Sequence, residues 1–64
     1  MLKSYTCFIH RPHKTVPNFV AVACADAERA MIQAERAAAE WRDWRIIEVF
    51  EGDRRVALRE RGMA

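Results

Sequence analysis

Glycine and serine are scarce in this 64-residue sequence, and this scarcity bears on catalysis. The only glycines are Gly52 and Gly62, whereas a phosphate-binding loop needs several glycines close together so that backbone N–H groups can reach the anion. Ser4 is the only serine, and nucleophilic catalysis also needs a base and an orienting group beside the nucleophile. We therefore expect no catalytic residues, no cofactor and no enzymatic activity.

Long apolar runs and a set of paired cysteines are also missing. No stretch approaches the ~20 consecutive apolar residues of a membrane-spanning helix, and the first residues lead into a polar segment rather than the apolar core of a signal peptide. Two cysteines are too few for a disulfide framework. We expect a soluble, cytoplasmic protein without a membrane partner.

The excess of positive charge is small. The formal net charge is +2, which does not by itself indicate a nucleic-acid partner. Hydrophobic residues make up 52% of the chain, which is high for its length. The length allows one small domain, residues 1–64. A domain of this size buries a modest core and commonly depends on a disulfide, a metal or a second subunit.

One amphipathic helix is predicted over residues 26–41. Asp26 is a good N-cap and Glu28 suits the first turn. Arg36 and Glu40 are spaced as an (i, i+4) ion pair. Apolar residues at three- and four-residue spacing form a stripe that is mostly alanine: Ala27, Ala30, Met31, Ala34, Ala38 and Trp41. Ile32 lies at the flank of this stripe, so the helix leaves it poorly buried.

Two strands are predicted on each side of this helix, separated by a Pro-containing loop (11–18) and a Gly-Asp turn (52–53). The predicted strands cover residues 3–10, 19–25, 44–51 and 54–59. The expected fold is α+β, a β-β-α-β-β chain forming a four-stranded, mainly antiparallel sheet with the helix on one face. The strand order 2-1-3-4 makes every neighbouring pair antiparallel, whereas the alternative, 1-2-3-4, places a parallel pair in the centre.

The turn at Gly52-Asp53 predicts which residues of the last two strands share a face. It pairs Phe50 with Arg55, Val49 with Val56 and Ile47 with Leu58, and this register places Ile47, Val49, Val56 and Leu58 under the helix. The same count in the first hairpin places six residues under the helix: Tyr5, Cys7, Ile9, Val20, Val22 and Cys24.

The other face of the sheet is then unusually aromatic for a small monomer, so something should cover it. Seven residues form this expected dimer or ligand face: Phe8, Phe19, Trp44, Ile46, Phe50, Arg55 and Arg59. One hypothesis is a non-enzymatic homodimer, formed through this face or by addition of edge strands. The alternative is a single-stranded nucleic-acid platform that uses five of these residues, although the RNP signatures of such domains are absent: Phe8, Trp44, Phe50, Arg55 and Arg59.

Cys7, His10 and His13, with Cys24 further on, resemble a zinc-ligand spacing. Side chains three residues apart on a strand point to opposite faces, so we expect no metal site. The cysteines are instead expected to be small buried residues and diagonal neighbours across the hairpin, reduced in the cytoplasm.

A basic corner at the end of the first predicted strand has two interpretations. It is either an anion contact or a solvated loop, and its residues are His10, Arg11, His13 and Lys14.

Residues 48–56 match the pattern E-[LV]-[WF]-x-G-x-R-x-[VI]. Together with the strand-like segments and the helix that begins at Asp26, this hairpin resembles a broad set of short bacterial hypothetical proteins with a β-β-α-β-β layout. The resemblance implies the fold, and it carries no activity and no site residues. The loop RPHKTVPN (11–18) is unlike the turn of those proteins.

Overall fold

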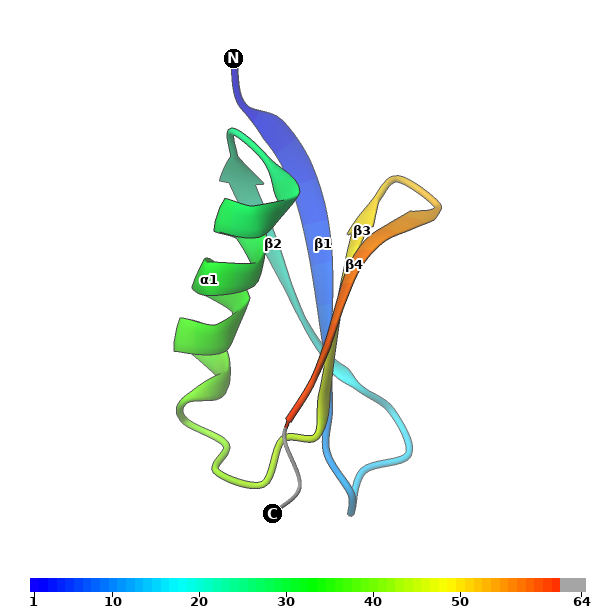
Figure 1. Ribbon diagram of the computed structural model, residues 1–64. Coiled ribbons are helices and arrows are strands. Elements are labelled where there is room, and N and C mark those ends of the chain that lie inside the picture. Colours follow the sequence, from blue (N-terminus) through cyan, green and yellow to red (C-terminus); the bar gives the residue numbers. More distant parts are fainter. Residues whose placement is uncertain (62–64) are drawn as a thin grey trace.

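The computed structural model describes residues 1–61 of the chain as a four-stranded sheet with a helix on one face (Figure 1). The elements along the chain are β1 (Lys3–His10), β2 (Asn18–Cys24), α1 (Ala27–Ala38), β3 (Ile46–Glu51) and β4 (Arg54–Glu60). The order across the sheet is β2-β1-β3-β4, and every neighbouring pair is antiparallel. The predicted α+β class and strand order are confirmed, and the alternative order with a parallel central pair is wrong.

The helix α1 begins where the sequence predicts. Asp26 has an extended backbone, and its Oδ1 accepts a hydrogen bond of 2.9 Å from the Arg29 backbone N–H. This bond satisfies one of the N–H groups that the first turn of a helix leaves without an intrahelical acceptor. The buried residues of α1 belong to the predicted stripe: Ala30, Met31, Ala34 and Ala38. Because three of these four are alanine, the helix can lie close to the sheet.

The end of α1 differs from the prediction, because the helix stops at Ala38 rather than at residue 41. The Trp41 N–H bonds to the carbonyl of Ala38 at 2.8 Å, an i→i−3 bond that tightens the chain into a turn. Trp41 still packs against the core, but from this turn rather than from the helix. Glu40 also lies beyond the helix, and within residues 1–61 it forms no ion pair with Arg36.

The core lies between α1 and the face of the sheet that α1 covers. The first hairpin has the predicted register, since Tyr5 pairs with Val22 and Cys7 with Val20. The sheet residues that are at most 4% exposed are Tyr5, Cys7, Ile9, Cys24, Ile47 and Val49. Val20 and Val22 are partly buried against this core. The predicted helix-facing set of the first hairpin is therefore confirmed.

The second hairpin departs from the predicted register after two residue pairs. Gly52, with a φ of +66° that suits glycine, makes the turn, and Phe50 pairs with Arg55 as predicted. An irregularity at Val49/Phe50 then pairs Val49 with Ala57 rather than with Val56. Such a β-bulge leaves one extra residue on the bulged strand and reverses the faces of the residues that follow it.

This bulge changes the faces of the β4 residues that follow Val56. Val56 and Ala57 both pack against the core. Leu58, predicted under the helix, pairs with Glu48 on the opposite face and is 47% exposed. The predicted helix-facing position of Leu58 is therefore wrong, while that of Val56 is confirmed.

Candidate interaction surface

The face of the sheet opposite α1, called the open face below, carries a row of three phenylalanines from three adjacent strands. Phe8 of β1 lies in the middle. Its ring centroid is 6.4 Å from that of Phe19 on β2 and 5.5 Å from that of Phe50 on β3, with an edge-to-face angle of 87° for the second pair. Phe19 is 67% exposed, whereas the other two rings are half-buried by their neighbours. The row therefore ends in a large apolar side chain that nothing in residues 1–61 covers.

A compensated ionic network lies beside this phenylalanine row. The carboxylate of Glu48 in β3 binds the His10 Nε2 atom at 2.7 Å through Oε1 and accepts a bond from Arg55 Nη1 at 3.1 Å through Oε2. The hydrogen bond with His10, followed by that from Arg55, lowers the pKa of Glu48 from its ordinary value. His10, Glu48 and Arg55 therefore all have a hydrogen-bonding partner within the chain.

Of the seven residues predicted for this face, five are placed together by the strand register: Phe8, Phe19, Ile46, Phe50 and Arg55. Arg59 is not among them, because after the bulge it pairs with Ile47 on the helix face, where its Nη1 donates a 2.7 Å bond to Glu35 of α1. Trp44 is not among them either. It precedes β3 and packs against the core, and the Arg61 guanidinium lies 5.2 Å from its ring centroid.

Leu58 joins the open face through the bulge, although the sequence predicts it under the helix. The available signal was the run Val56-Ala57-Leu58, three consecutive apolar residues that break the alternation expected of a strand with one buried face. A bulge that directs Val56 and Ala57 toward the core and Leu58 to the open face explains such a run.

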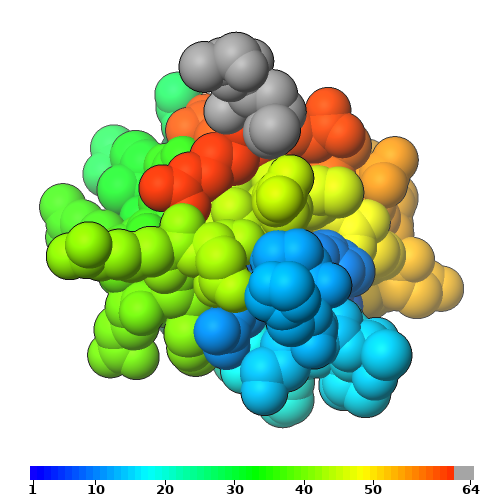
Figure 2. All heavy atoms as spheres, turned by 90° about the horizontal axis from the view of Figure 1, so that it is seen from below, coloured from blue at the N-terminus to red at the C-terminus, as the bar shows by residue number. Residues whose placement is uncertain are grey.

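The predicted basic corner lies at the end of the molecule shown in Figure 2, where the loop after β1 lies beside the segment that joins α1 to β3. Arg11 donates a 3.0 Å bond from Nε to Asp43 and lies 5.7 Å from the Trp41 ring centroid. This hydrogen bond holds the pKa of Asp43 below its usual value. Arg11 therefore ties two loops together, and only His13 and Lys14 of the loop remain as exposed basic side chains.

The cysteines and histidines do not converge. Cys7 lies under α1 with its Sγ 3.9 Å from the carbonyl oxygen of Ala30, whereas His10 points to the open face. Burial, and next the electrostatic effect of Cys24, raise the pKa of the Cys7 thiol. Within residues 1–61 no three side chains of the metal-binding types come together.

The two thiols are both free and buried, but they are not the predicted diagonal neighbours. Cys24 pairs with Lys3, two inward-facing positions away from Cys7, and the Tyr5–Val22 pair lies between them.

Comparisons with known proteins add no relative. No protein-family model matches the sequence, and searches of curated proteins and of solved structures found no match either. In residues 1–61, α1 is the only helix, and no helix there has the length and hydropathy needed to cross a bilayer.

Proposed function

We propose that this protein is a non-enzymatic, homo-oligomeric interaction module of the cytoplasm that pairs with a second copy through its open face. The observation that carries the proposal is the phenylalanine row, which ends in the 67% exposed ring of Phe19. Contiguous apolar surface of this kind marks interaction sites on small proteins. The reduced, buried state of Cys7 and Cys24 suits a reducing compartment.

The charges of the open face favour a second copy as the occupant. Burying an unpaired charge is costly, but Glu48 is already paired with His10 and Arg55 within the same chain. The apolar row can therefore pack against its own copy about a two-fold axis without leaving a buried charge alone. A standard interface removes about 800 Å² from each partner, or about a sixth of the 4776 Å² surface of this chain.

Fewer observations favour the single-stranded nucleic-acid platform. Stacking platforms combine exposed aromatic rings with free cations along the backbone path. The indole of Trp44 is not available for base stacking on the open face, because it packs against the core, and Arg59 is bound to Glu35 on the other face. Arg55 remains on the open face but is paired with Glu48.

The test is the absolute mass in solution, measured by light scattering behind a sizing column at low and high salt. We expect the wild-type chain to be a dimer at both salt concentrations, and Phe19→Glu to be a monomer because it places a charge at the end of the apolar row. Val16→Glu is the matched control, since Val16 is 75% exposed in the loop before β2 and should leave the dimer intact. Circular dichroism verifies that both variants fold.

A wild-type monomer, or a Phe19→Glu variant with an unchanged dimer mass, would contradict the proposal. If the wild type is a monomer, titration with a labelled single-stranded oligonucleotide at low salt tests the nucleic-acid alternative. Binding that weakens steeply with added salt would support a nucleic-acid platform.

A further inference from the structure

The two edge strands of the sheet, β2 and β4, are protected to very different degrees. An edge strand presents unpaired N–H and C=O groups, and proteins usually guard it with charged residues, proline or a bulge. β4 has both a bulge and four charged residues among its seven: Arg54, Arg55, Arg59 and Glu60. β2 is also seven residues long, NFVAVAC, but contains no charge, no proline and no glycine, and its pairing with β1 is regular.

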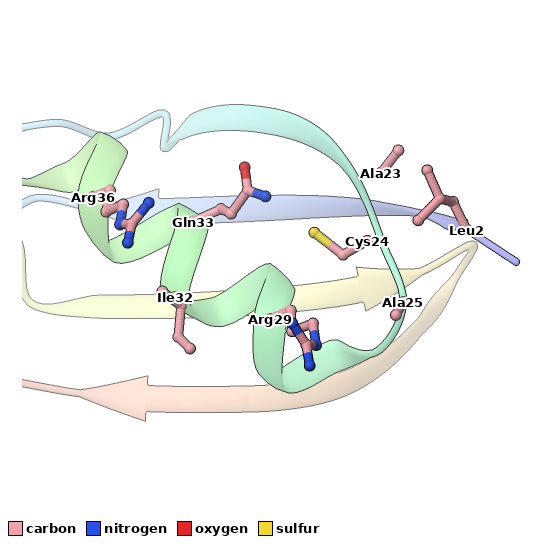
Figure 3. A pocket seen from close by; sticks show the side chains of 8 residues that line it. All are labelled: Leu2, Ala23, Cys24, Ala25, Arg29, Ile32, Gln33 and Arg36. Atoms are coloured by element: carbon pink, nitrogen blue, oxygen red, sulfur yellow. The ribbon is translucent and has the colours of Figure 1, made fainter.

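An open depression of about 450 Å³ lies between the C-terminal end of β2 and the flank of α1 (Figure 3). Ala23 and Cys24 of β2 line one side of it. Leu2 and Ile32 also line it, and they are 67% and 46% exposed. The unguarded end of the β2 edge therefore adjoins a depression with two partly exposed apolar lining residues.

The helix side of this depression is cationic. Arg29, Gln33 and Arg36 line it from successive turns of α1 (Figure 3), and no acidic residue is among the described residues that line it. Arg36 has no ion-pair partner within residues 1–61, and Arg29 has only the exposed Asp26 at 3.8 Å. Seven residues of helix separate the two arginines by about 10 Å along the axis, which lies between the spacings of about 7 Å and about 13 Å at which side chains share one face of a strand.

We propose that the β2 edge accepts an extended, acidic segment of a partner protein as a fifth strand. The backbone of the segment would bond to the free edge of β2, as in other cases of strand addition. Its side chains facing α1 would place apolar groups against Ile32 and Leu2, and carboxylates near Arg29 and Arg36. The β2 edge is a different surface from the open face, although Phe19 of β2 contributes to the open face, and the proposal does not depend on dimer formation there.

Charge favours such a partner over a second copy at this edge. Antiparallel pairing of β2 with its own copy would bring the helices of the two chains side by side. The stripe that contains Arg29 and Arg36 would then face the same stripe of the other chain, and like charges facing each other disfavour a complex. An acidic strand instead meets both arginines with opposite charge.

The first measurement uses a labelled peptide, Thr-Glu-Thr-Val-Thr-Glu-Thr, which in a strand places both glutamates and the valine on one face. It is titrated with the full chain at low salt and followed by fluorescence anisotropy. The comparison peptide has lysine in place of both glutamates. We expect only the acidic peptide to bind. We also expect it to shift the backbone amide resonances of β2 and slow their hydrogen exchange, while the amides of β4 stay unchanged. Phe50→Ser, which removes apolar surface of the open face on β3, should bind the peptide as well as the wild type does, because β1 separates Phe50 from the β2 edge.

The variant that tests the charge is the double substitution Arg29→Glu and Arg36→Glu. It should weaken the acidic peptide by about tenfold or more and gain affinity for the lysine peptide. The matched control, Arg42→Glu with Arg54→Glu, changes the net charge equally at exposed positions away from the depression. If the double variant folds poorly, Arg36→Gln alone should still weaken the acidic peptide.

Four results would overturn the proposal. These are no binding of the acidic peptide, equal binding of the lysine peptide, an equal loss of affinity in the control variant, and resonance shifts confined to β4 or the open face. Concentration-dependent protection of the β2 amides without any peptide would show that a second copy occupies the edge instead.

Discussion

The two faces of the sheet are built from alternate residues of the same strands, yet they differ in what covers them. The helix face presents aliphatic side chains and small thiols, such as Ile9, Ile47 and Cys7, which are fully buried by α1. The open face presents phenylalanines and a compensated ionic network, and Phe19 at its edge is largely in solvent. The helix face is thus completed within one chain, whereas the open face is not. The helix face therefore stabilises the fold, whereas the open face keeps apolar surface in solvent.

The largest expected effect comes from two neighbouring isoleucines that point to opposite faces. Ile47 is fully buried under α1, so Ile47→Ala should lower the free energy of unfolding by about 2–5 kcal/mol. Ile46 is only half-buried on the open face, so Ile46→Ala should cost about 1 kcal/mol or less. Urea unfolding at low protein concentration measures both values. Equal costs would mean that the open face is as tightly covered as the helix face.

A smaller effect is expected where alanines let the helix approach the sheet. Ala34 is completely buried, and Ala34→Leu should cost about 1–3 kcal/mol because the added atoms push α1 away from its neighbours. Ala21 is exposed on the open face, so Ala21→Leu should change the stability of the monomer very little. Thermal unfolding of the two variants, compared with the wild type, gives the difference. If Ala34→Leu is as stable as Ala21→Leu, α1 is loosely packed against the sheet.

The helix face could be predicted from the sequence to a large extent, because period-two alternation and a helical stripe are strong local signals. Tyr5, Cys7 and Ile9 alternate cleanly, and the cap at Asp26 has a direct chemical cause. The end of α1 was less predictable, since the alanines that precede residue 41 would allow the helix to continue. What stops it is the tertiary packing of Trp41 from a turn, which local propensity does not encode.

The open face was predicted less completely because its far side depends on the register of β4. A two-residue turn fixes the first pairs of a hairpin, but a bulge beyond the turn reverses every later position. That one extra residue moved Leu58 onto the open face and Arg59 off it. Trp44 was misplaced for another reason, since the strand was predicted to begin at residue 44 and β3 begins at Ile46.

The ionic network of the open face should give the protein a specific acid sensitivity. The pKa of Glu48 in the fold lies below its ordinary value, because its carboxylate bonds to His10 and Arg55. Ionised Glu48 therefore stabilises the fold above the pKa of an unfolded glutamate, about 4.3, and this contribution is lost as the pH falls through the lower folded value. When the pH is lowered below 5, the free energy of unfolding should fall less in Glu48→Gln than in the wild type. Unfolding at fixed protein concentration and a series of pH values measures this difference. An acid dependence identical to that of the wild type would contradict the assigned network.

The smallest expected effect tests the bulge that separates the two faces. Glu35 of α1 and Arg59 of β4 are joined by a 2.7 Å bond with both side chains partly exposed, so a double-mutant cycle with alanine should give a coupling of about 0.2–1 kcal/mol. The matched cycle of Glu35 with Arg55 should give no coupling, because Arg55 lies on the open face and binds Glu48. A hairpin without the bulge would place both arginines on the open face, and then neither cycle would show coupling. Coupling confined to Arg59 would therefore locate the reversal between residues 55 and 59, and would show that a single extra residue decides which arginine supports the helix and which one remains beside the phenylalanine row.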